Sequence, residues 1–127
     1  MRKAISTKLA PQAIGPYEQG VQVGHMIFVS GQIPLNAEGI MVQGDIELQT
    51  KQVMHNIEAI LAEAGSSLDD VVKSTIFLTD MQLFSQVNQV YETFFQNQKP
   101  ARSTVAVKEL PKNAIIEIEV IAIKSEG

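Results

Sequence analysis

Several short stretches of the chain are rich in apolar and β-branched residues and are bounded by polar or turn residues, which is typical of β-strands. Two of them, residues 21–23 and 26–29, flank Gly24-His25, where a glycine in the first turn position suits a two-residue hairpin. Further strands are predicted at residues 71–79, 103–107 and 115–123, and a weaker edge strand at residues 3–6.

Two longer segments carry apolar residues at helical spacing instead. The first spans residues 45–64, where Asp45 can cap the helix and Gly65 can end it. The second follows Asp80, has an apolar face rich in aromatic residues, and must end before Pro100. The order β-β-β-α-β-α-β-β predicts a two-layer α+β sandwich, in which two helices cover a six-stranded mixed sheet.

The last predicted strand has apolar residues on both of its faces. Ile116 and Ile118 fall on one face, whereas Ile121 and Ile123 share the other face with Glu117. Two helices can cover only one side of the sheet, so we expect the other side to pack against further copies of the chain. Glu117 would then lie at or near a boundary between subunits.

Composition narrows the classes of function. A chain of 127 residues with 45% hydrophobic content predicts a single domain, residues 1–127. Cysteine is absent, which excludes thiolate catalysis and cysteine metal sites. The net charge of −4 comes without a basic stripe, so nucleic acid is not expected as a partner. No segment has the pattern of a signal peptide or a membrane span, and a cytoplasmic protein is the expectation.

Two charged residues stand out from this apolar background. Arg102 is one of only two arginines and opens a β-branched run, where a fixed guanidinium suits the binding of an anion. Glu117 lies in an apolar strand, where a carboxylate is costly to bury unless it is paired or used in chemistry. Together they predict a site for a small carboxylate with a carboxylate base beside it.

Four short motifs, in order along the chain, resemble those of the RidA (YjgF-type) family of reactive-intermediate deaminases. They are Ala13-Ile14-Gly15-Pro16-Tyr17, Ser30-Gly31-Gln32-Ile33-Pro34, Pro100-Ala101-Arg102-Ser103, and Leu110-Pro111 followed by Glu117-Ile118-Glu119. The resemblance implies a homotrimer with a chorismate-mutase-like fold. It also implies that clefts between subunits hydrolyse 2-enamino and 2-imino acids to 2-keto acids and ammonia, without metal or organic cofactor.

The resemblance also implies roles for individual residues. Arg102 would bind the substrate carboxylate, and Glu117 would orient or activate water. The residues expected around the substrate are Tyr17, Ser30, the backbone of Gly31, Phe84, Asn88 and Thr104. Thr104 replaces the cysteine of a common form of the motif; its hydroxyl can still form hydrogen bonds, but a thiolate role is lost.

Alternatives stay open at this point. Tyr17 could only pin a loop through its hydroxyl, Asn88 could be a surface amide, and Phe84 could belong to the core. In a trimer, Asn88 and Arg102 are expected to approach one site from neighbouring chains. Burial would raise the pKa of Glu117, whereas a nearby Arg102 would lower it. A non-catalytic ligand-binding or regulatory trimer that acts through a protein partner is the alternative function, and an isomerase suggested by the fold alone ranks last.

Overall fold

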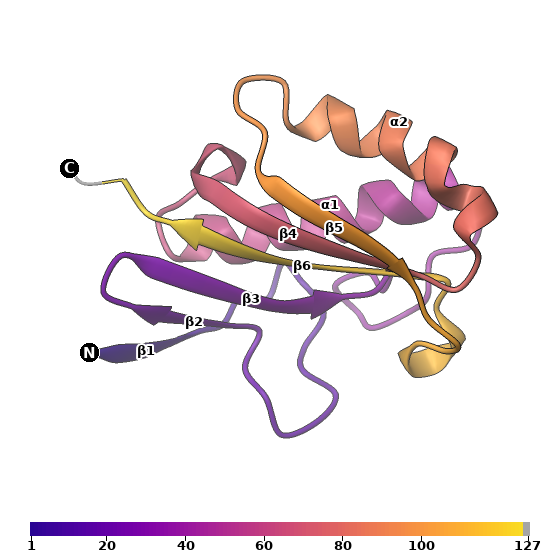
Figure 1. Cartoon of the computed structure of the whole chain (residues 1–127). Helices are drawn as coiled ribbons and strands as arrows, with labels where there is room; N and C mark the ends of the chain where they lie inside the picture. Colours follow the sequence, from indigo (N-terminus) through magenta and orange to yellow (C-terminus); the bar gives the residue numbers. More distant parts are fainter. Residues whose placement is uncertain (126–127) are drawn as a thin grey trace.

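The computed structural model describes residues 1–125, and Glu126 and Gly127 lie outside the described residues. Eight regular elements follow one another along the chain (Figure 1). They are β1 Arg2–Ile5, β2 Gly20–Val23, β3 Met26–Gln32, α1 Ile46–Glu63, β4 Val71–Leu78, α2 Phe84–Phe94, β5 Ala101–Ala106 and β6 Ile116–Ile123. Their order is the one predicted from the sequence, and each strand end lies within three residues of its expected position.

The strands form one mixed sheet of six, in the order β1-β2-β3-β6-β4-β5. Only β4 and β5 are parallel, and α2 provides the crossover between them. Both helices lie on the same side of the sheet (Figure 1). The expected two-layer α+β sandwich is therefore confirmed.

The ends of the helices follow from local hydrogen bonds. The Asp45 side chain accepts a hydrogen bond from the backbone N–H of Leu48, and Gly65 takes a φ of +77° just beyond the end of α1. The second helix was expected to begin directly after Asp80. Its first turn, Met81–Leu83, is instead a 3-10 helix, in which the N–H of Leu83 bonds the carbonyl of Asp80 and the Asp80 side chain caps the N–H of Gln82, and α2 begins at Phe84.

The core lies between the helices and one face of the sheet. Ile76, Ile116 and Ile118 have no exposed surface there. On the other face, Phe28 and Ile123 are 40% and 47% exposed. This face, called the open face below, carries the apolar side chains of Val21, Val23, Met26, Phe28, Phe77, Val105, Ile121 and Ile123. The uncovered apolar face predicted from the sequence is thus present.

Within residues 1–125, none of the helices combines the length and the apolar character needed to cross a membrane. The cytoplasmic location and the extent of the domain stay predictions.

Candidate functional site

Arg102 is held by side chains of α2 on the helix side of the sheet. Its Nη1 donates a hydrogen bond of 2.7 Å to Asn88 Oδ1. The guanidinium carbon lies 5.1 Å from the centre of the Tyr91 ring and 5.5 Å from that of Phe84, within the range of cation–π attraction. The guanidinium orientation is therefore set by one amide and two aromatic rings.

These three partners share one face of α2. Phe84, Asn88 and Tyr91 are spaced by four and three residues, which places them above one another on a helix. The expectation that Asn88 and Arg102 approach a site from neighbouring chains is wrong, because the two side chains bond within one chain. The reason is the parallel pairing of β4 and β5, which brings Arg102 under the helix that connects these strands.

No carboxylate in residues 1–125 lies within ion-pairing distance of the half-buried Arg102. The guanidinium borders a cleft of about 430 Å³, and only one of its N–H groups has a hydrogen-bond acceptor in this part of the chain. The cleft is lined by Asn88, Tyr91, Glu92, Phe95, Lys99, Pro100 and Arg102. An oriented guanidinium with free donors is suited to bind a carboxylate through two parallel hydrogen bonds.

Glu117 lies on the open face, against an irregularity of β3. The register between β3 and β6 shifts between Val29 and Gln32, so that Ser30 and Gly31 form a β-bulge. A Cβ atom at residue 31 would lie 2.7 Å from the Glu117 carboxyl carbon. Only glycine therefore allows the carboxyl group to lie against the strand at this point.

The environment of Glu117 favours its protonated form. Burial raises the pKa of this carboxyl group, and the nearby Glu119 raises it further. Arg102 on the other side of the sheet does not contribute. No residue in the described part of the chain donates a hydrogen bond to Glu117, which leaves its oxygens available to a bound molecule.

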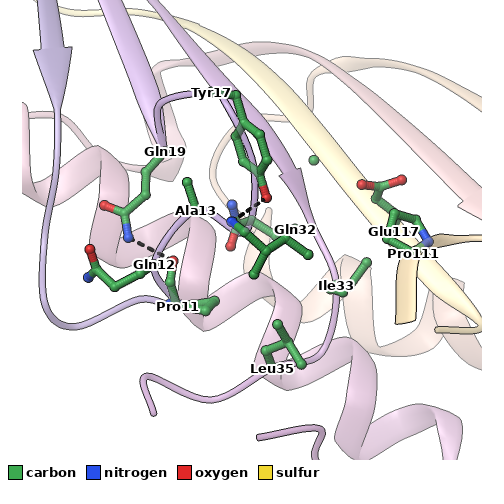
Figure 2. A pocket seen from close by; sticks show the side chains of 12 residues that line it. Pro11, Gln12, Ala13, Tyr17, Gln19, Gln32, Ile33, Leu35, Pro111 and Glu117 are labelled. Atoms are coloured by element: carbon green, nitrogen blue, oxygen red, sulfur yellow. Dashed lines mark hydrogen bonds between the residues drawn. The ribbon is translucent and has the colours of Figure 1, made fainter. Parts of the chain in front are cut away.

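Glu117 borders a pocket of about 110 Å³ (Figure 2). In the figure, Gln12 and Pro11 lie on one side of the pocket, Ile33 and Glu117 on the other, and the Tyr17 ring points between them. The pocket is lined by Pro11, Gln12, Ala13, Ile14, Tyr17, Gln19, Gly31, Gln32, Ile33, Leu35, Pro111 and Glu117.

Tyr17 and Ser30 lie near this pocket and also serve the loop before β2. The Tyr17 hydroxyl accepts a hydrogen bond of 3.2 Å from the N–H of Ile14, which is the loop-pinning role considered above. The Ser30 hydroxyl donates a hydrogen bond of 2.6 Å to the backbone carbonyl of Glu18. Its proton is thus engaged, and its oxygen lone pairs could still accept a hydrogen bond.

Thr104 lies two residues beyond Arg102 on β5, so both side chains point to the helix side of the sheet. Its buried hydroxyl oxygen has no hydrogen-bond partner among residues 1–125. A hydroxyl group that can both donate and accept a hydrogen bond is therefore present on the same side of the strand as the guanidinium.

Arg102 and Glu117 lie on opposite faces of the sheet. Arg102 is paired with Ser74 of β4, which is fully buried under the helices. Glu117 is paired with Phe77, three residues further along β4, and an odd separation reverses the face. Three residues of strand also separate the two positions by about 10 Å along the sheet. One small molecule therefore cannot contact both groups of the same chain.

A model of the protein family described as endoribonuclease L-PSP matches residues 7–124. The chain belongs to this family. A solved structure from Yersinia pestis, described as a protein of the conserved Rid family, is 50% identical with a TM-score of 0.94, and covers 97% of this chain and 99% of its own. The resemblance to the RidA family is thereby confirmed.

Two relatives of this chain carry names that indicate different functions. The 2-iminobutanoate/2-iminopropanoate deaminase of Escherichia coli K12 is 47% identical over 127 residues, which is 98% of this chain and 99% of the relative. AldR of Lactococcus lactis, named as a candidate regulator, is 54% identical over 121 residues, 94% of this chain and 96% of the relative. The solved structure of Escherichia coli TdcF holds bound serine; it is 44% identical with a TM-score of 0.93, and covers 97% and 99% of the two chains.

Two residues near the candidate site of this protein were not predicted from the sequence. Tyr91 belongs to the aromatic-rich apolar face of the second helix, and its position one turn from Asn88 is the signal in the sequence that could have found it. Gln19 lies buried beside the pocket, where its amide bonds the backbone of Thr7, Ala10 and Pro11 and so fixes the loop that carries Tyr17. A single glutamine before a strand gives no sequence signal for this role.

Proposed function

We propose that this protein is a deaminase that hydrolyses 2-imino acids, and the 2-enamino acids with which they interconvert, to 2-keto acids and ammonia. The observation that carries the proposal is the Arg102 guanidinium, which is oriented by Asn88 and two rings and has no carboxylate partner within residues 1–125. The name of the Escherichia coli deaminase supports the reaction. The serine bound to TdcF supports the class of ligand, since serine carries the same carboxylate.

The residues suggest a simple course for the reaction. Arg102 holds the substrate carboxylate through two hydrogen bonds and so fixes C2. The oxygen of a water molecule adds to C2 of the protonated imine while Glu117 takes one proton of that water, which gives a carbinolamine. Glu117 returns the proton to the nitrogen and, as a carboxylate again, takes the proton of the new hydroxyl. The C2–N bond breaks, the hydroxyl oxygen becomes the keto oxygen, and the departing ammonia takes the proton from Glu117 and leaves as ammonium. Water is the only co-reactant, so the reaction as written needs no metal or organic cofactor.

The other predicted residues have supporting roles in this proposal. Phe84 stacks on Arg102, and Thr104 offers its unpartnered hydroxyl to the substrate. The backbone N–H of Gly31 and the side chains of Tyr17 and Ser30 would border the substrate next to Glu117.

We further propose that Arg102 of one copy and Glu117 of another act on the same substrate in a homotrimer. Their placement on opposite faces excludes a shared substrate within one chain. The open face offers the apolar surface through which copies can pack. The number of copies rests on the family resemblance.

The test is a coupled assay in which an amino-acid dehydratase or oxidase generates imino acids, and keto-acid formation is followed with and without the protein. We expect acceleration by the wild type and loss of most of it in Glu117→Gln, since removal of a general base costs about a hundredfold to ten-thousandfold. Arg102→Ala should also lose the binding of pyruvate. Full activity of both variants would refute the assignment of the site.

Complementation between variants tests the shared site. Arg102→Ala and Glu117→Gln chains are unfolded together and refolded as mixed trimers. Each site then needs its arginine from one variant and its glutamate from the other, so about a quarter of the sites are intact and about a quarter of the activity returns. Mixtures of Arg102→Ala with Asn88→Ala are the control and should not recover, because these residues bond within one chain.

A ligand-binding or regulatory trimer is the second candidate, and the relative named as a candidate regulator favours it. It would retain pyruvate binding at Arg102 without accelerating imine hydrolysis. An RNA substrate has no electrostatic support, because the net charge is −4.

A further inference from the structure

Two buried hydroxyl groups next to Arg102 form a hydrogen bond with each other. Ser74 of β4 has no exposed surface, Tyr91 of α2 is 7% exposed, and their oxygens lie 2.5 Å apart. Ser74 is the residue opposite Arg102 in the parallel pairing of β4 and β5. The hydroxyl pair therefore lies at the same level of the sheet as the guanidinium.

The core does not require these hydroxyls. Alanine and phenylalanine would leave nearly the same shape, and the residues on either side of Ser74 on this face, Val71 and Ile76, are apolar. The hydrogen bond instead fixes the orientation of the Tyr91 ring, because it is the only hydrogen bond of the Tyr91 side chain among residues 1–125. Burial raises the pKa of the Tyr91 hydroxyl, so the ring stays neutral and the bond stays intact at neutral pH.

The orientation of the Tyr91 ring in turn constrains the guanidinium of Arg102. The centre of the ring lies 5.1 Å from the guanidinium carbon, and Tyr91 and Arg102 border the same cleft. Asn88 engages only Nη1, and a single hydrogen bond leaves the guanidinium plane free to rotate about it. The ring face provides a second constraint.

We propose that the Ser74–Tyr91 hydroxyl pair is a positioning device for Arg102, which fixes the tilt of the guanidinium so that its free N–H groups face a carboxylate in the cleft. The identity of that carboxylate as substrate rests on the proposed function. Tyr91 and Ser74 are positioning residues, and Arg102 remains the group that touches the ligand.

The test compares Tyr91→Phe, Ser74→Ala and the double variant with the wild type in a pyruvate titration followed by NMR. We expect the pyruvate dissociation constant to rise about tenfold in all three, since a misdirected charged hydrogen bond is worth about that much. The KM of the imino acid should rise similarly, with a smaller change in kcat. Stability should follow a different order: each single variant leaves one buried hydroxyl unpaired and lowers Tm, whereas the double variant recovers.

Thr50→Val is the matched control, because it removes a fully buried hydroxyl from α1, away from the cleft. It should lower Tm without changing pyruvate affinity. If the double variant recovers both Tm and wild-type pyruvate affinity, the hydroxyl pair only stabilises the core and the proposal is overturned. Should the double variant fail to fold, Tyr91→Phe alone carries the same expectation and the same refutation.

Arg102→Ala, measured in parallel, separates this proposal from the proposed function. If Arg102→Ala loses pyruvate while the double variant keeps it, only the positioning role fails. If Arg102→Ala itself binds pyruvate like the wild type, the carboxylate receptor fails, and the positioning role fails with it.

Discussion

Replacing Gly31 by alanine should reduce activity strongly while leaving stability nearly unchanged. The added methyl group would lie 2.7 Å from the carboxyl carbon of Glu117, whereas carbon atoms normally approach to about 3.5–4.0 Å. Since the strand on either side is paired, the glutamate side chain must move by roughly 1 Å. A misplacement of this size can cost about a hundredfold in rate, or about 2.7 kcal/mol of transition-state stabilisation.

The stability of Gly31→Ala should change little for two reasons. The clash falls on the end of a half-exposed side chain that can rotate, and the backbone at residue 31 does not have the positive φ that only glycine tolerates well. Alanine also lowers the entropy of the unfolded chain, which stabilises by about 0.4–1 kcal/mol and offsets part of the strain. The measurements are kcat/KM in the coupled imine assay and thermal unfolding of the same samples.

Glu117→Gln supplies the control for Gly31→Ala, because the carboxylate is then already absent. In that background the alanine should cost less than about threefold in activity, so the two substitutions are strongly non-additive. Full activity of Gly31→Ala, or the same loss in both backgrounds, would show that the close approach of residue 31 to Glu117 has no part in catalysis.

Three further predictions follow from the same geometry. Arg102→Lys should be nearly as inactive as Arg102→Ala, with a loss of about 1.5–3 kcal/mol in carboxylate affinity, because an ammonium cannot form the two-point contact. A pyruvate titration measures this loss, and wild-type affinity in the lysine variant would contradict the prediction. Glu117→Gln should be more stable than the wild type at pH 7, because a raised folded-state pKa means that ionisation of Glu117 opposes folding. The difference in unfolding free energy should vanish as the pH falls below about 4.3, the usual pKa of glutamate. Denaturant titrations across pH measure this difference, and a difference that does not change with pH would contradict the prediction. Phe28→Asp on the open face should give an inactive monomer in light scattering, and an active monomer would disprove the shared site.

The regular elements could be predicted from the sequence because each depends on a local pattern. The caps of α1, the hairpin at Gly24 with its φ of +61°, and the two-sided apolar character of β6 all follow from residues close together in the chain. Arg102 and Glu117 could be selected as well, because a charge within an apolar strand is conspicuous without knowledge of its partners.

The relation between these residues could not be predicted, because it depends on pairing between strands. The side of the sheet on which Arg102 lies is set by its register with Ser74, and that of Glu117 by its register with Phe77. Neither register can be read from a single strand. The bond between Asn88 and Arg102 likewise requires the parallel pairing that places α2 above β5, and the bulge at Gly31 is visible only against β6.

The separation of Arg102 and Glu117 by the thickness of the sheet makes the proposed catalyst sensitive to its own abundance. A chain that has folded but not yet met another copy would have both reactive groups and no complete site. Specific activity would then fall on dilution below the dissociation constant of the assembly, and scarce protein would be disproportionately inactive. Turnover would depend on a power of the protein concentration greater than one in that range, and would become proportional to it only once assembly is saturated.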